Sequence, residues 1–139
     1  CKINLYYLYM KKIKGFEISF EIGGYRLECY KIFNRDYSII IQTTYSFGPR
    51  IESRKVECSK AEWENFWIEI DKLNIWKWEK NYFLDARDGI QWELMIDKKG
   101  RQRRRIYGSN KYPNNFELLT NLINQISKMN DEILGFSYE

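Results

Sequence analysis

The most consequential absence in this chain of 139 residues is histidine. Histidine is the commonest general base near neutral pH and the commonest zinc ligand. Its absence excludes Ser-His-Asp and Cys-His nucleophilic sites, and nearly all zinc sites, unless a partner supplies the histidine. A phosphate-binding loop is not indicated either, because Gly23-Gly24 lacks the lysine and the following helix that such a loop needs. The sequence therefore predicts no metal and no cofactor.

Cysteine and proline are also scarce, at three and two residues. Three is an odd number, and Cys29 and Cys58 are isolated and lack C-x-x-C spacing, so no disulfide framework is indicated. These features favour a reducing, cytoplasmic location.

No apolar run reaches the roughly 20 residues needed to cross a bilayer, so no association with a membrane is expected. Met10 is followed by two lysines and resembles a natural start, so residues 1–9 are interpreted as an extension. The alternative is a lipid-modified Cys1, although lipoproteins usually continue into a polar tether.

Aromatic residues, in contrast, are abundant, at 17% of the chain. All five tryptophans fall between Trp63 and Trp92. Rings crowded in this way form either one thick core or a concave aromatic surface. With 44% hydrophobic and 30% charged residues, the chain is predicted to fold as a single globular domain over residues 1–139.

The first third of the chain predicts strands. Residues 16–22 alternate between apolar and polar side chains, which is typical of a half-buried strand. Gly23-Gly24 then predicts a two-residue hairpin turn. In that hairpin Cys29 lies opposite Ile18, on the apolar face, and is expected in the core.

Two further strands and a helix are expected next. Residues 37–45 alternate clearly and residues 51–58 more weakly. Ser59 and Glu62 have the spacing of a capping box, in which each side chain bonds the other residue's backbone N–H. Together with apolar residues at helical spacing, this box predicts a helix over 60–73.

The remaining chain predicts a hairpin and a second helix. Residues 90–97 alternate, residues 98–100 form a turn and residues 101–107 return. An amphipathic helix is expected over 113–129. The sequence therefore predicts an α+β fold: an antiparallel β-meander plus a C-terminal β-hairpin, with two amphipathic helices packed on one face.

The predicted hairpin carries a basic run. It holds six positive charges, and taking them from the net charge of +4 leaves −2 for the rest of the chain. Such a run beside aromatic residues suits contact with nucleic acid. The alternative is a solvated hairpin, in which Asp97 faces Arg101 and Glu93 faces Arg105 across the strands. The cations are Lys98, Lys99, Arg101, Arg103, Arg104 and Arg105.

A second group of candidate residues lies in the loops 85–92 and 108–112, which the hairpin brings to the same end of the sheet. Carboxylate, hydroxyl, amide and phenol groups beside tryptophan are typical of a pocket for a polar ligand. The same residue types also form turns and caps. The candidate ligand-binding residues are Tyr82, Asp85, Asp88, Trp92, Ser109, Asn110 and Tyr112.

The stretch from Ser59 onward resembles a family of small uncharacterised bacterial proteins. The resemblance rests on a tryptophan-rich helix, a D-G-x-x-W strand at residues 88–92, and the segment Gly-Ser-Asn-Lys-Tyr-Pro-Asn-Asn-Phe at residues 108–116. It covers about the last three-fifths of the chain. The resemblance implies a bacterial, cytoplasmic α+β protein and no established activity.

Three functions remain open at this point. The first is a non-catalytic binding module whose protein or small polar ligand contacts the 85–92 and 108–112 loops. The second is a nucleic-acid-binding protein that uses the 98–105 hairpin. The third is a histidine-independent enzyme with Asp85 or Asp88 as base and Tyr82 or Tyr112 as acid.

Overall fold

The computed structural model of the chain describes residues 16–24, 28–45, 51–86 and 89–129. These residues form a mixed seven-stranded sheet and two helices, so the predicted α+β class is confirmed. In chain order the elements are β1 (Phe16–Gly24), β2 (Cys29–Arg35), β3 (Ser38–Thr44), β4 (Ile51–Glu57), α2 (Lys60–Asp71), the 3-10 helix η1 (Ile75–Lys77), β5 (Asn81–Phe83), β6 (Ile90–Lys98), β7 (Arg104–Ser109) and α3 (Phe116–Ser127).

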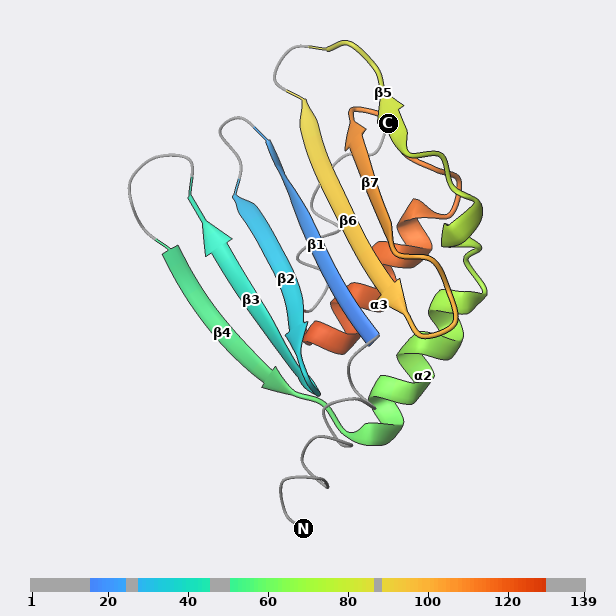
Figure 1. Cartoon of the computed structure of the whole chain (residues 1–139). Coiled ribbons are helices and arrows are strands. Elements are labelled where there is room, and N and C mark those ends of the chain that lie inside the picture. Colours follow the sequence, from blue (N-terminus) through green and yellow to red (C-terminus); the bar gives the residue numbers. More distant parts are fainter. Residues whose placement is uncertain (1–15, 25–27, 46–50, 87–88, 130–139) are drawn as a thin grey trace.

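Strands β1 and β6 form the centre of the sheet, whose strand order is β4-β3-β2-β1-β6-β7-β5 (Figure 1). Neighbouring strands are antiparallel, except that β5 runs parallel to β7. Strands β1 and β6 pair along their whole length, from Phe16 opposite Lys98 to Gly24 opposite Ile90. This long-range pairing joins the two halves of the chain into one sheet.

Helices α2 and α3 lie side by side against one face of the sheet (Figure 1). Period-two alternation places Ile18, Phe20 and Ile22 beneath them, at no more than 5% exposure. The residues between these three point to the opposite face, which we call the outer face. Burial of each large apolar side chain contributes about 1.5–3 kcal/mol. The helices complete the core with Trp63, Phe66, Trp67, Ile70, Phe116, Leu119 and Ile123.

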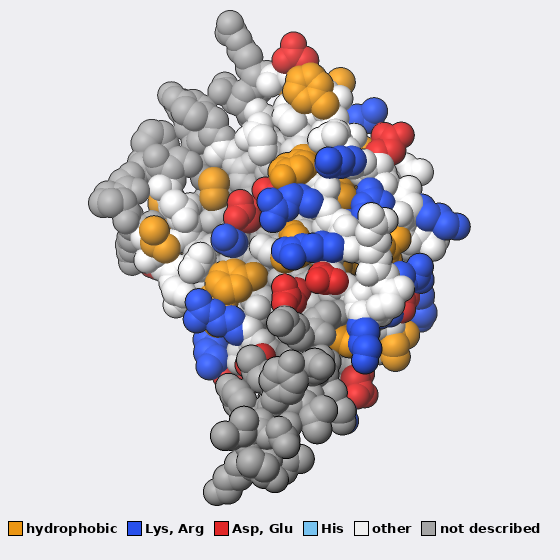
Figure 2. Space-filling model, in the orientation of Figure 1, with side chains coloured by type: hydrophobic (Ala, Val, Ile, Leu, Met, Phe, Trp, Pro, Cys, Tyr) orange, Lys and Arg blue, Asp and Glu red, His pale blue; other side chains and the backbone are white. Residues whose placement is uncertain are grey.

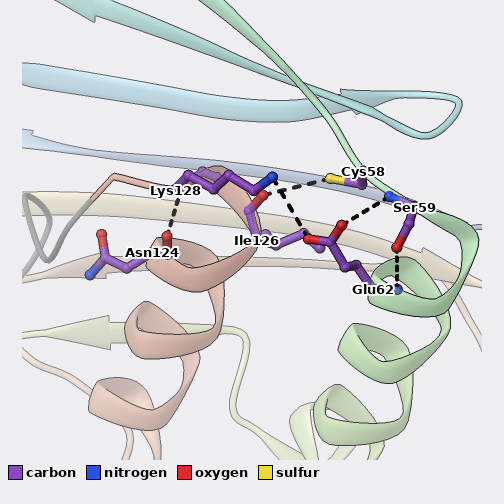
Figure 3. Close-up of polar contacts among 7 residues, drawn as sticks. Cys58, Ser59, Glu62, Asn124, Ile126 and Lys128 are labelled. Carbon is purple, nitrogen blue, oxygen red and sulfur yellow. Dashed lines mark hydrogen bonds and ion pairs between the residues drawn. The ribbon is translucent and has the colours of Figure 1, made fainter.

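The start of α2 meets the end of α3 (Figure 3). The predicted capping box is confirmed: the Glu62 backbone N–H donates to the Ser59 hydroxyl at 3.1 Å, and the Ser59 N–H donates to the Glu62 carboxylate at 3.2 Å. The Lys128 ammonium lies 3.9 Å from the Glu62 carboxylate, and the Cys58 thiol donates to the Ile126 carbonyl at 3.6 Å (Figure 3). Burial raises the pKa of the Cys58 thiol. The two helix ends are therefore held together by polar contacts as well as by packing.

Consecutive strands β1 and β2 pair antiparallel, but the predicted two-residue turn at Gly23-Gly24 and its register are wrong. Both glycines belong to β1 and pair with β6, and Ile22 lies opposite Tyr30 of β2. A Cβ at Gly23 would stand 2.3 Å from the Cys29 Sγ, so the glycine is needed for close approach of two strands and not for a turn. Cys29 accordingly lies half-buried on the outer face, and its expected place opposite Ile18 in the core is also wrong.

The register of the β6–β7 hairpin also differs from the prediction. Arg105 lies opposite Met95 and not Glu93, and Arg104 lies opposite Ile96. The connection spans residues 99–103 and is longer than the predicted turn, and the Trp76 indole N–H donates to the Gln102 carbonyl within it at 2.9 Å. A shift of two residues leaves every side chain on its expected face.

Among the described residues, no helix has both the length and the apolar character that crossing a membrane requires.

Candidate functional site

Asn110, a predicted ligand-binding residue, uses its side chain within the protein. Its amide oxygen accepts a hydrogen bond from the Ile90 backbone N–H at 2.8 Å, and its amide nitrogen donates to the Leu84 carbonyl at 3.2 Å. A Cβ at Gly89 would lie 1.6 Å from that amide oxygen, so the glycine makes room for the clamp. The backbone φ of Asn110 is 58°, a left-handed conformation that asparagine tolerates better than most residues. Asn110 therefore joins three chain segments at one end of the sheet.

Trp92 and the neighbouring tyrosines form a row of packed rings. The Trp92 indole N–H donates to the Lys111 carbonyl at 3.0 Å, and the centre of the Trp92 ring lies 5.9 Å from that of Tyr82 and 4.7 Å from that of Phe116. Tyr112 continues the row, with its ring 4.9 Å from Phe116. The structure thus brings three predicted site residues together, and it does so largely as part of the core.

The other predicted site residues are more dispersed. Ser109 is half-buried on the outer face opposite Gln91. Asp85 is exposed in the segment after β5. Asp88 lies outside the described residues, so the histidine-independent enzyme that would use it stays a prediction.

The basic run is largely occupied by contacts within the protein. Arg104 donates to the carbonyls of Trp76 and Trp78, both at 2.6 Å. Arg101 stacks over the Trp76 ring at 5.0 Å, and Lys98 pairs with Asp71. A separate ion pair joins Arg105 to Glu93 at 3.5 Å. Lys99 and Arg103 are the remaining cations of the run, and both are exposed.

A pocket of about 550 Å³ lies on the outer face of the sheet. Figure 2 views this face and shows basic and acidic side chains interleaved across it. The polar lining comes from four adjacent strands and from β7 at one side. It consists of Glu21, Lys31, Gln42, Thr44, Gln91, Glu93 and Tyr107.

Two rows of cross-strand neighbours shape the pocket. One row crosses β3, β2, β1 and β6 as Thr44, Cys29, Gly23 and Gln91. These side chains are short at the centre, because the Gly23 backbone comes too close to Cys29 to carry a Cβ. Small side chains beside larger ones leave a hollow in the sheet surface.

The second row forms the charged wall of the pocket. It runs from Gln42 through Lys31, Glu21 and Glu93 to Tyr107, in the strand order β3, β2, β1, β6, β7. Glu21 and Glu93 are directly opposite each other, an arrangement that is unfavourable for two like charges. Each carboxylate has its own cation: the Lys31 ammonium is 3.3 Å from Glu21, and Arg105 is 3.5 Å from Glu93.

Exposed aromatic rings lie at the β5 side of the pocket. Tyr107 lines the pocket and is 40% exposed, and Phe83, on the neighbouring strand, is 69% exposed. Both side chains are on the outer face, since Tyr107 pairs with Asn81 and Phe83 with Ser109. Large exposed rings next to a hollow are typical of ligand-contacting surfaces.

Within residues 16–24, 28–45, 51–86 and 89–129, no cluster of cysteine and carboxylate groups could hold a metal ion.

Glu21, Lys31 and Gln42 line the pocket but were not among the predicted site residues. Alternation along each strand places these residues on the polar face, and that signal was present. Their assembly with Glu93 depends on the pairing of β1 with β6, which no local pattern reveals.

Comparison of the sequence with protein-family models gives no match, and comparison with curated proteins gives none. The resemblance of the region after Ser59 therefore remains a prediction.

Proposed function

We propose that this protein is a non-catalytic binding module whose small polar ligand occupies the outer-face pocket. One observation carries the proposal: a hollow of about 550 Å³ lined by charged, amide, hydroxyl and phenol groups from five strands. Ligand pockets of small molecules fall in the range of roughly 300–1,000 Å³ and combine such convergent polar groups with apolar surface.

The proposed site differs from the predicted loop surface but adjoins it. Gln91, Trp92 and Gly108 of the predicted 85–92 and 108–112 ranges line the pocket. The clamp made by Asn110 lies at the start of β6, and the ring of Trp92 lies on the inner face, behind the pocket. We therefore assign the predicted residues a supporting role and the ligand contacts to the strand residues in front of them.

Nucleic-acid binding by the 98–105 hairpin is the weaker candidate. Four of its six cations make contacts inside the protein, although Arg101 and Arg105 are exposed, as Lys99 and Arg103 are. Affinity for nucleic acid grows with the number of phosphates neutralised, and a cation that already has a partner in the protein would have to give up that contact to bind a phosphate.

The test is a thermal-shift screen of the whole chain against sugars, amino acids, nucleosides, polyamines and organic acids. Thr44→Trp places a large ring in the pocket at an exposed position. Lys55→Trp is the matched control, because it adds the same ring to an exposed outer-face position on β4 outside the pocket.

The expected result is a compound that raises the Tm of the wild type and of Lys55→Trp but not of Thr44→Trp. At a ligand concentration 100 times Kd, the stabilisation is about 2.7 kcal/mol. The proposal is wrong if no compound raises the Tm, or if Thr44→Trp responds as the wild type does.

A further inference from the structure

We infer that the ligand of the outer-face pocket is a neutral, hydroxyl-rich compound, which means a mono- or disaccharide. The inference rests on the proposed function and names the chemical class of the ligand. It follows from the charge balance of the pocket wall, the order of its hydrogen-bonding groups and the exposed ring beside it.

The charges of the wall are already balanced by the protein. Glu21 is paired with Lys31 and Glu93 with Arg105, at 3.3 and 3.5 Å. An anionic ligand would meet two carboxylates opposite each other across β1 and β6. A cationic ligand would compete with two cations that the fold already holds in place. Neither an anionic nor a cationic ligand gains much binding energy from this wall, so a neutral ligand is favoured.

The hydrogen-bonding groups of the wall match hydroxyls. Lys31 offers only donors, Glu21 and Glu93 only acceptors when ionised, and Gln42 offers both. A hydroxyl both donates and accepts, so one hydroxyl beside the Lys31–Glu21 pair can accept from the ammonium and donate to the carboxylate. Hydrogen bonds to charged groups are also stronger than bonds between neutral groups. A ligand with several adjacent hydroxyls forms more hydrogen bonds with this wall than a ligand with a single polar group.

The ring of Tyr107 supplies the apolar contact that a sugar needs. A pyranose ring has one face of C–H groups, which covers the face of an aromatic ring. Tyr107 stands at the end of the charged wall and is 40% exposed. Phe83 extends the aromatic surface beyond it and is 69% exposed, which gives room for a second sugar unit.

The experiment is calorimetric titration of the whole protein with two panels of ligands at 50 and 500 mM NaCl. The neutral panel holds glucose, galactose, mannose, N-acetylglucosamine, maltose and cellobiose. The charged panel holds glucuronate, glucosamine, spermidine and citrate. We expect at least one neutral sugar to bind with a Kd that does not change with salt, since no counterion is released.

Variants assign the binding to the pocket. Glu21→Gln is expected to weaken the sugar about tenfold, because one charged hydrogen bond is lost. Glu17→Gln is its matched control, being on the same strand and the same face but outside the pocket, and it should bind as the wild type does. Tyr107→Ala should weaken binding about tenfold, whereas Tyr107→Phe keeps the ring and most of the affinity.

Each contrary outcome has a separate meaning. If no sugar of the neutral panel binds at 50 mM NaCl, the inference is wrong. If only charged compounds bind, and Thr44→Trp abolishes that binding, the inference is wrong while the proposed pocket function stands. If a sugar binds equally well to Thr44→Trp and to the wild type, both the inference and the proposed function are wrong.

Discussion

Asn110 shows how one polar residue can define the end of a sheet. Its amide oxygen bonds the start of β6, its amide nitrogen bonds the segment after β5, and its own backbone N–H donates to the Ile90 carbonyl at 2.9 Å. A residue with this many local bonds supports the shape of the neighbouring pocket without needing to touch a ligand. Its contribution is therefore expected in stability first and in binding only indirectly.

Asn110→Ala should destabilise the fold by about 2 kcal/mol. The Ile90 N–H loses its partner in a half-buried site, which alone costs about 1–3 kcal/mol. The positive φ of 58° adds strain for alanine. Urea unfolding followed by tryptophan fluorescence measures the effect. Ser109→Ala is the neighbouring control and should stay within about 0.5 kcal/mol of the wild type; an equal loss in both variants would contradict the clamp.

At this scale the sequence identified Asn110 and Trp92 as candidate ligand-binding residues, whereas in the structure their side chains bond other parts of the protein. Asn110 and Gly89 were identifiable as turn residues, and Trp92 as a large ring at the same end. Polar side chains that bind a ligand and polar side chains that bond a backbone are of the same types. Only the positions of the Ile90 N–H and the Leu84 carbonyl distinguish the two roles.

At the scale of elements, the start of α2 is coupled to the end of α3 by charge. The Ser59 backbone N–H, then the Ser59 hydroxyl and the Lys128 ammonium, lower the pKa of the Glu62 carboxyl. A lowered pKa means that the folded state favours the ionised form. Glu62 thus stabilises the fold above the pKa of an unfolded glutamate, about 4.3, and this contribution is lost as the pH falls through the lowered folded-state value.

Glu62→Gln should therefore be less stable than the wild type at pH 7, and the two should converge as the pH falls below about 4. Glutamine keeps the capping-box hydrogen bond, so the variant isolates the charge. Thermal unfolding from pH 7 to pH 3 measures the difference. Glu64→Gln removes an exposed ion pair with Lys60 on the same helix and should change stability less. A difference between wild type and Glu62→Gln that does not depend on pH would contradict the coupling.

At the scale of elements, features that depend on residues close in sequence were predicted more accurately than the pairing of strands. The capping box of α2 depends on residues three apart, and it was correct. The glycine turn depended on assuming that the strand ends at Ile22, whereas both glycines belong to β1 and pair with β6. The register of β6 against β7 is displaced by two residues from the prediction, and the loop between them bonds Trp76, which is far from the turn in sequence. Both errors therefore concern contacts between residues that are distant in sequence, which local patterns do not reveal.

At the scale of the whole molecule, one sheet separates stability from recognition. The inner face is covered by α2 and α3 and holds the apolar residues of the central strands. The outer face carries interleaved charges and the pocket (Figure 2). This division could be predicted from alternation alone, but the pocket could not, because its wall joins strands from both halves of the chain.

Adjacent residues of β6 test this division directly. Leu94 is fully buried beneath the helices, whereas Met95 is half-buried on the outer face opposite Arg105. Leu94→Ala leaves a cavity between sheet and helices and should cost about 2–5 kcal/mol. Met95→Ala removes a side chain of similar size from a face that water reaches, and it should cost about 1 kcal/mol.

Chemical denaturation of both variants, with the binding assay repeated on each, gives the decisive comparison. Because Leu94 faces away from the pocket, Leu94→Ala should lower the denaturation midpoint while leaving ligand affinity unchanged under conditions where it is folded. Met95 lies one cross-strand row from the Glu21–Glu93 pair, so its variant should also bind normally. Equal destabilisation by the two substitutions would mean that the outer face is as much a part of the core as the inner one, and a covered outer face would leave no open pocket for a ligand.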